Sequence, residues 1–199
     1  MNDSDCTLTM LLKTRIHPVS VPVCLPDNTT GSEATFPGDF FADGSQFLLV
    51  YFYPGDFTTI CTTELIAFHE KLDAFADLDV SVVGCSTNGP EVHAAWKRTP
   101  KEAGGLGTQI NHCLISDPDR HLARIFDVLI PSRNVATRGL FILDRNGEIL
   151  FESRHDTKIA RDISQILSTV ADVRKIFADI PKRPRNYSTD SSQMSPQLI

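Results

Sequence analysis

No two cysteines of this chain lie close together in the sequence. There are five of them, at positions 6, 24, 61, 85 and 113. An odd count and wide spacing argue against a disulfide-stapled scaffold and against a Cys-x-x-Cys redox pair. They also argue against a structural zinc site, whose ligands usually come in close pairs, and the six histidines are equally scattered. We therefore expect no bound metal and no other cofactor.

The chain also has no long apolar run, no leader-like start and no excess of basic residues. Its longest apolar stretch covers residues 47–53, far short of a bilayer span. The first residues are acidic and resemble neither a secretory signal nor an Arg-rich transit peptide. The formal net charge of −6 leaves no basic surplus to neutralise phosphates. We therefore expect a cytoplasmic protein that binds neither nucleic acid nor membrane.

What is present is an alternation of strand-like and helix-like segments. The apolar runs 46–53 and 79–86 each predict a strand buried on both faces, and 113–116 predicts a shorter one. Helical patterns start near residues 59 and 90, and Asp117-Pro118 predicts the start of another helix. Asn146-Gly147 predicts a hairpin of 139–144 with 148–153, before a helical stripe over 163–177. This order predicts an α/β fold with a mixed central sheet and helices on both faces.

The same pattern divides the chain into three regions. Residues 1–35 are expected to form an irregular arm because prolines and a turn cluster at 28–32 interrupt them, although 19–23 could lie along a sheet edge. Residues 36–180 are expected to form the folded domain. Residues 181–199 are rich in polar residues and lack periodicity, which predicts a disordered tail.

The segment 53–65 joins a buried strand to a helix and contains the one cysteine with an evident chemical setting. Cys61 is placed in or near the first helical turn, at the carboxyl end of a central strand, where α/β folds build their sites. Unpaired amide groups and the positive end of the helix dipole favour a thiolate there, and the thiolate is the nucleophile. Thr58 can place a hydroxyl beside the sulfur, and Pro54 shapes the loop without offering a competing amide hydrogen.

The remaining cysteines have plainer interpretations. Buried, inert cysteine is common, and Cys24, Cys85 and Cys113 lie in apolar runs or ordinary loops. Cys6 lies near an exposed terminus. Arg138, taken by itself, is equally well a surface arginine at the start of a strand.

The residues around Cys61 resemble those of the peroxiredoxins, the family that includes alkyl hydroperoxide reductase C and thiol-specific antioxidant proteins. The family pattern Pro-x-x-x-Thr-x-x-Cys is present as Pro54, Thr58 and Cys61, and the resemblance extends over roughly 40–175. Further matching segments, in order, are Tyr51-Phe52-Tyr53, Thr63-Glu64, residues 82–96, residues 104–107, Ser116-Asp117-Pro118 and Arg138–Asp144.

This resemblance implies a thioredoxin-like fold and a thiol peroxidase. Cys61 would attack a hydroperoxide, either hydrogen peroxide or an organic one, and become a sulfenic acid. Thr58 would hold the peroxide, Arg138 would stabilise the thiolate and the departing oxygen, and Glu64 would orient the arginine. The family further implies a homodimer or a ring of dimers.

The sequence departs from the common 2-Cys members of the family in two ways. No cysteine follows Cys113, so the usual C-terminal resolving cysteine is missing, and Thr62 stands where those members usually have proline. Cys61-Thr62-Thr63-Glu64 is instead typical of 1-Cys members.

Three interpretations of the cycle remain. An external thiol, glutathione or a thioredoxin-like protein, reduces the sulfenate. Alternatively, Cys24 or Cys6 resolves it. In the third, the chain is a divergent paralogue with an impaired cycle that serves as a chaperone-like or redox-sensing binding subunit. A Cys-His hydrolase is a further alternative class, but nothing in the sequence singles out a histidine partner for Cys61.

Overall fold

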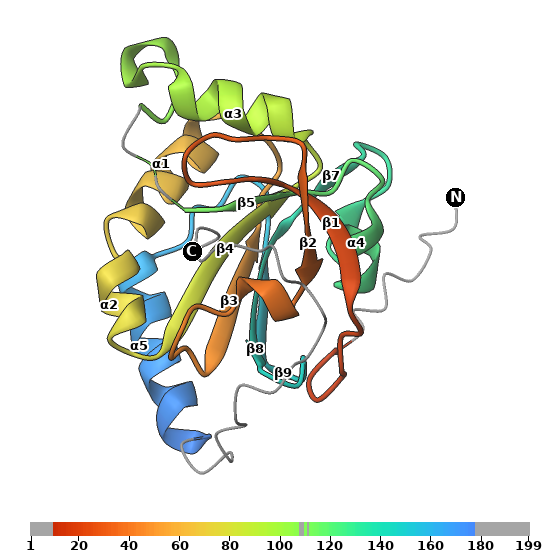
Figure 1. Ribbon diagram of the computed structural model, residues 1–199, viewed down its shortest axis with the longest axis vertical. Coiled ribbons are helices and arrows are strands. Elements are labelled where there is room, and N and C mark those ends of the chain that lie inside the picture. The colour runs from red at the N-terminus through yellow and green to blue at the C-terminus, as the bar shows by residue number, and fades with distance from the viewer. Residues whose placement is uncertain (1–9, 108–109, 111, 178–199) are drawn as a thin grey trace.

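The computed structural model describes residues 10–107, 110 and 112–177, which form a sheet flanked by helices (Figure 1). The strands are β1 Val19–Cys24, β2 Ser32–Phe36, β3 Phe47–Phe52, β4 Val80–Ser86, β5 Leu114–Ser116, β6 Leu129–Ile130, β7 Val135–Ala136, β8 Arg138–Asp144 and β9 Ile149–His155. The helices are α1 Thr59–His69, α2 Leu72–Ala76, α3 Pro90–Arg98, α4 His121–Ile125 and α5 Ile163–Ile176. Among the described residues, no helix combines the length and the apolar character needed to cross a bilayer.

Seven of the strands form one mixed sheet in the order β2-β1-β5-β4-β3-β8-β9. β3, β4 and β5 are parallel to one another, whereas β8 and β9 form an antiparallel hairpin on one side, with β8 also antiparallel to β3. β1 and β2 form a second hairpin on the other side, with β1 antiparallel to β5. The remaining strands, β6 and β7, pair separately. This is the mixed α/β, thioredoxin-like arrangement that the sequence predicts.

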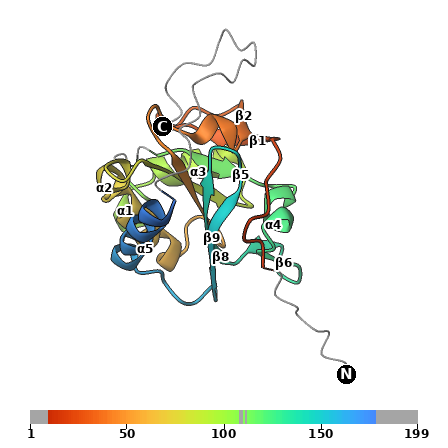
Figure 2. The same ribbon diagram turned by 90° about the horizontal axis from the view of Figure 1, so that it is seen from below.

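Helices cover both faces of the sheet, as Figure 2 shows, with α1, α2 and α5 on one side and α4 on the other. One apolar core lies between the sheet and the helices α1, α2, α3 and α5, and includes Cys61 and Trp96. The second core lies on the opposite face and includes Phe126 of the segment after α4. β3 is buried along its whole length because both of its faces and both of its edges are covered, which explains its uninterrupted apolar sequence.

The arm predicted to be irregular up to residue 35 contains two regular strands. β1 pairs with β2 over Val19–Val23 and with β5 at Val23 and Cys24, so β2 rather than β1 is the sheet edge. Pro22 lacks an amide hydrogen, but it lies outside the two-residue pairing with β5, so the proline does not interrupt that ladder. Residues 1–9 of the predicted arm and the predicted tail 181–199 lie outside the described residues.

Two predicted helix boundaries also differ from the structure. The helix expected to start at Asp117-Pro118 starts instead at His121, because Arg120 takes a left-handed conformation with φ of 57°. Asp117 still caps it, since its carboxylate accepts the amide hydrogens of Leu122 and Ala123 at 3.1 and 2.8 Å. The apolar stripe that starts near 59 is divided into α1 and α2 by a break at residues 70–71.

Candidate active site

Cys61 is the third residue of α1, directly after the loop that leaves the carboxyl end of β3. Its side chain is 1% exposed, so the sulfur lies within the protein rather than on its surface. Thr58 is the N-cap residue, with extended backbone, and α1 therefore begins at Thr59, two residues before Cys61. The structure places the predicted nucleophile in the first turn of a helix, as the sequence indicates.

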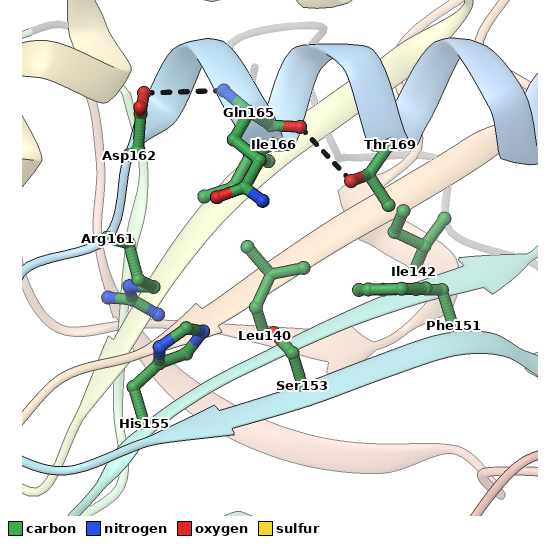
Figure 3. A pocket seen from close by; sticks show the side chains of 10 residues that line it. All are labelled: Leu140, Ile142, Phe151, Ser153, His155, Arg161, Asp162, Gln165, Ile166 and Thr169. Carbon is green, nitrogen blue, oxygen red and sulfur yellow. Dashed lines mark hydrogen bonds between the residues drawn. The ribbon is translucent and has the colours of Figure 1, made fainter.

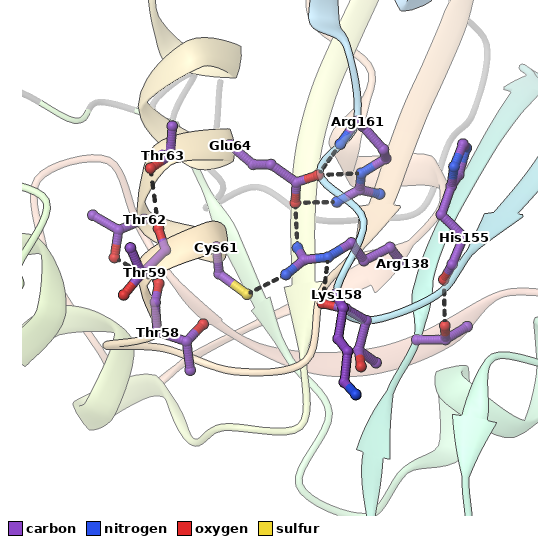
Figure 4. Close-up of polar contacts among 12 residues, drawn as sticks. Thr58, Thr59, Cys61, Thr62, Thr63, Glu64, Arg138, His155, Lys158 and Arg161 are labelled. Carbon is purple, nitrogen blue, oxygen red and sulfur yellow. Dashed lines mark hydrogen bonds and ion pairs between the residues drawn. The ribbon is translucent and has the colours of Figure 1, made fainter.

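Arg138, the first residue of β8, points at the sulfur (Figure 4). Its Nη2 donates to Cys61 Sγ at 3.5 Å, its Nη1 forms an ion pair with Glu64, and its Nε donates to the carbonyl of Thr157 at 3.0 Å. All nitrogens of the guanidinium are thus held, and the side chain is almost completely buried. The structure brings together Cys61, Arg138 and Glu64, which are separated by up to 77 residues in sequence.

Arg161 is a fourth member of this cluster and was not singled out in the sequence. It lies two residues before α5, and its Nε and Nη2 donate to the two oxygens of Glu64 at 3.1 and 3.0 Å. Its backbone amide also donates to Glu64 at 2.7 Å, and its Nη1 donates to the carbonyl of Gly139 at 2.8 Å. No local spacing links positions that lie 97 residues apart, so the sequence carries no signal for this contact.

Two arginines and one carboxylate leave this buried cluster with an excess of one positive charge. Burial acts to raise the pKa of Glu64, but the charge and hydrogen bonds of Arg161, together with the charge of Arg138, hold that pKa below its ordinary value. Glu64 therefore stays ionised and fixes both guanidinium groups, one of which faces the sulfur.

Glu64 should make the folded state sensitive to acid. Because its pKa is lower in the folded chain than its ordinary value of 4.5, its contribution is complete above that value and is lost as the pH falls through the lowered pKa. We expect the free energy of unfolding, measured with urea, to decline over this acid range. Glu64→Gln should lose this pH-dependent contribution. Near neutral pH its free energy of unfolding should be about 3–5 kcal/mol lower, because two buried guanidinium groups lose their carboxylate. If the free energy of unfolding of that variant fell with pH as steeply as that of the parental chain, other carboxylates would be responsible for the decline.

Thr58 and Pro54 complete the loop in front of the sulfur. The hydroxyl of Thr58 donates to the carbonyl of Gly55 at 3.0 Å, which leaves its oxygen able to accept a hydrogen bond from a bound molecule. The side chain of Thr58 is exposed, whereas Pro54 is buried against the body of the protein. Thr62 closes the first turn of α1, since its amide and its hydroxyl both donate to the carbonyl of Thr58 at 2.9 Å. A proline at that position could make neither bond.

The described cysteines other than Cys61 are unpaired and buried, which makes them poor nucleophiles toward an oxidised Cys61. Burial raises the pKa of the thiols of Cys24 and Cys85, and that of Cys113 to about 12. Cys24 belongs to the same apolar core as Cys61. A thiol with a raised pKa is mostly protonated near neutral pH, and it is the thiolate that reacts. Cys6 lies outside the described residues.

Neither a metal nor a histidine partner of Cys61 is found in the described part of the chain. No group of three or more His, Cys, Asp or Glu side chains there could hold a metal ion. The hydrogen bond recorded for the sulfur within the same residues comes from Arg138 and not from an imidazole. The geometry thus gives no support to a Cys-His hydrolase, which needs a histidine base beside the sulfur.

A pocket of about 150 Å³ lies between α5 and the hairpin β8–β9 (Figure 3). Its wall includes Arg161 together with His155 and Gln165, but none of Pro54, Thr58, Cys61 and Arg138 lines it. The pocket therefore meets the cluster at Arg161 and is not lined by Cys61.

Comparison with known proteins decides the family. The sequence model of the AhpC/TSA family matches residues 23–151, which include Cys61, Glu64 and Arg138. The chain belongs to the AhpC/TSA family of peroxiredoxins. The family and the fold predicted from the sequence are thereby confirmed.

Several relatives and solved structures support the membership. The chain is 36% identical to the mitochondrial thioredoxin-dependent peroxide reductase of Homo sapiens over 151 aligned residues. The alignment covers 76% of this chain and 59% of the human protein. It is 31% identical over 153 residues to the chloroplastic 2-Cys peroxiredoxin BAS1 of Hordeum vulgare, covering 77% of this chain and 72% of the barley protein. The reduced 2-Cys peroxiredoxin of Plasmodium vivax superposes with a TM-score of 0.76 at 30% identity, covering 90% of each chain. The chain thus spans less than two thirds of the human relative.

Proposed function

We propose that the chain is a thiol peroxidase in which Cys61 reduces hydrogen peroxide and organic hydroperoxides. The observation that carries this proposal is the contact of 3.5 Å between the Arg138 guanidinium and the sulfur, in a cluster with one excess positive charge. The relatives named as peroxide reductases and peroxiredoxins support the same chemistry. The intact arrangement of Cys61, Arg138 and Glu64 argues against a paralogue that has lost its catalytic cycle.

The reaction is a displacement at oxygen. The Cys61 thiolate attacks one peroxide oxygen, an S–O bond forms and the O–O bond breaks. The sulfur is oxidised by two electrons to a sulfenic acid, and the departing oxygen takes up a proton and leaves as water or an alcohol. Arg138 supplies positive charge where negative charge develops, and the Thr58 hydroxyl oxygen accepts a hydrogen bond from the peroxide.

The second half of the cycle requires a reductant. We assign it to an external thiol, a thioredoxin-like protein or glutathione, because the described cysteines other than Cys61 are buried and burial raises the pKa of each of their thiols. The name of the human relative, a thioredoxin-dependent reductase, favours a thioredoxin-like partner.

A homodimer or a ring of dimers is part of the same proposal. It rests on the family and on the place of β9 as the last strand of the sheet, although Lys13 and Thr14 already bond to the start of that strand at Ile149. A cytoplasmic location remains a prediction from the sequence.

The sulfenate is the decisive product. One equivalent of hydrogen peroxide should give a dimedone adduct at Cys61, detected by mass spectrometry after non-reducing digestion. Cys24→Ala should give the same adduct and the same turnover with an external thiol. Recovery of a Cys61–Cys24 disulfide, with turnover lost in Cys24→Ala, would replace the 1-Cys cycle by internal resolution. The absence of any oxidation at Cys61 would contradict the peroxidase itself.

A further inference from the structure

Asp56 is a buried carboxylate in the loop that carries Thr58 and leads to Cys61. Only 9% of the residue is exposed. Its Oδ1 accepts a hydrogen bond from the Tyr53 hydroxyl at 3.0 Å, and its Oδ2 lies 2.7 Å from Nδ1 of His93. Its backbone amide donates to Oδ1 of Asn88 at 3.0 Å. The loop is thus tied at this residue to the segment after β4 and to α3.

His93 is completely buried in α3 and links the loop to the sheet. Its Nε2 lies 3.2 Å from the carbonyl oxygen of Ile115 in β5, on the opposite side of the ring from Asp56. Both ring nitrogens therefore face groups that usually only accept hydrogen bonds. Both contacts are satisfied when one proton lies on Nε2 and a second is held between Nδ1 and the Asp56 carboxylate. The pair then forms a continuous connection from the β5 backbone to the loop.

The backbone between Asp56 and α1 has an unfavourable conformation that neighbouring contacts must stabilise. Phe57 has a φ of 58°, a left-handed conformation that an aromatic residue rarely adopts. A conformation of this kind persists only where neighbouring contacts impose it. Asp56 precedes Phe57 and Thr58 follows it, so the bonds of Asp56 and the bond from Thr58 to Gly55 hold both ends of the strained residue.

We propose that Asp56 and His93 form a clamp that positions Thr58 and the first turn of α1 for reaction with peroxide. The proposal rests on the proposed peroxidase function and adds to it two positioning residues. Neither side chain is in hydrogen-bonding contact with Cys61 or Arg138, so both act through the loop. A buried polar pair of this kind is directional, whereas apolar packing would fill the same space without fixing the loop's orientation.

The test compares peroxide reactivity with general thiol reactivity. Asp56→Ala and His93→Ala should each lower the second-order rate constant of Cys61 with hydrogen peroxide by roughly 10- to 100-fold. The rate of Cys61 alkylation by iodoacetamide, which needs the thiol but no bound peroxide, should fall much less. The double variant should lose no more than the worse single variant, since the two residues act as one unit.

Two variants of nearly unchanged volume keep the test decisive if the alanine variants do not fold. Asp56→Asn retains acceptors and donors that suit Tyr53 and a neutral His93, so its peroxide rate should stay close to the parental one. His93→Gln can bond to Asp56 or to Ile115 but not to both, and its rate constant with peroxide should fall as in the alanine variants.

Asp144→Asn is the matched control, because Asp144 is a buried carboxylate that accepts amide hydrogens in the β8–β9 turn, at the opposite end of β8 from Arg138. It should reduce stability and leave the peroxide rate unchanged.

The possible outcomes test the clamp and the proposed peroxidase function separately. A folded His93→Gln variant that keeps the parental peroxide rate overturns the clamp while the peroxidase stands. Equal losses of peroxide and alkylation rates also overturn it, since they indicate general destabilisation. A parental chain whose Cys61 does not react with peroxide overturns both.

Discussion

Replacing Cys61 by serine is expected to abolish peroxide consumption while the fold survives. The serine hydroxyl has nearly the shape of the thiol, but it does not ionise near neutral pH and cannot form a sulfenic acid. The contacts of Arg138 with Glu64 and Thr157 do not involve the sulfur and should hold the site together. The measurement is hydrogen peroxide consumption in the presence of an external thiol, with circular dichroism to confirm folding.

Cys85→Ala is the matched control for this substitution. Cys85 is as buried as Cys61, but it lies in β4 and belongs to the core on the opposite face of the sheet. We expect this variant to lose some stability and to keep the parental rate of peroxide consumption. A Cys61→Ser variant that still consumed peroxide at the parental rate would refute the assignment of the nucleophile.

The second large effect is expected at Arg138. Arg138→Ala should lower the rate constant with peroxide by about 10²–10³-fold, the usual loss when a donor to a developing negative charge is removed. The variant should also be less stable, because one of the two guanidinium partners of the buried Glu64 disappears. Stopped-flow measurement of Cys61 oxidation gives the rate, and urea unfolding gives the stability.

A lysine at position 138 separates charge from geometry. The guanidinium reaches the sulfur, Glu64 and Thr157 at once through different nitrogens, and a single ammonium group does not reproduce that fork. Arg138→Lys should therefore recover only part of the rate. Arg174→Ala serves as the control: its ion pair with Asp79 is partly exposed to solvent, and its loss should change the free energy of unfolding by no more than about 1 kcal/mol. Full activity in Arg138→Ala would remove the arginine from the mechanism.

The parts of the fold that the sequence predicts correctly have strong local signals. β3 and β4 are continuous apolar runs, Asn146-Gly147 marks the β8–β9 hairpin, and α5 has a long apolar stripe. The errors occur where local signals are weak or misleading. β1 contains a proline yet lies inside the sheet, and Asp117 caps its helix from four residues upstream rather than from the N-cap position directly before it.

The candidate site shows the same division. Pro54, Thr58, Cys61 and Glu64 fall within eleven consecutive residues, and a strand-to-helix junction is enough to bring them together. Arg161, by contrast, meets Glu64 across 97 residues, and His93 meets Asp56 across 37. Neither separation corresponds to the repeat of a helix or a strand, so sequence patterns could not have paired these residues.

Local sequence patterns were enough to predict the alternation of elements, the family, and the cysteine that follows β3 in the first turn of a helix. They were enough because helix starts, buried strands and a short motif are properties of neighbouring residues. The surroundings of that cysteine, by contrast, follow from the packing of the whole chain. The sheet places the start of β8 and the segment before α5 against α1, so that two arginines share one carboxylate beside the sulfur. It also places α3 and β5 behind the loop, where His93 holds Asp56. Such contacts depend on how strands are ordered in the sheet, and that order is a property of the whole chain.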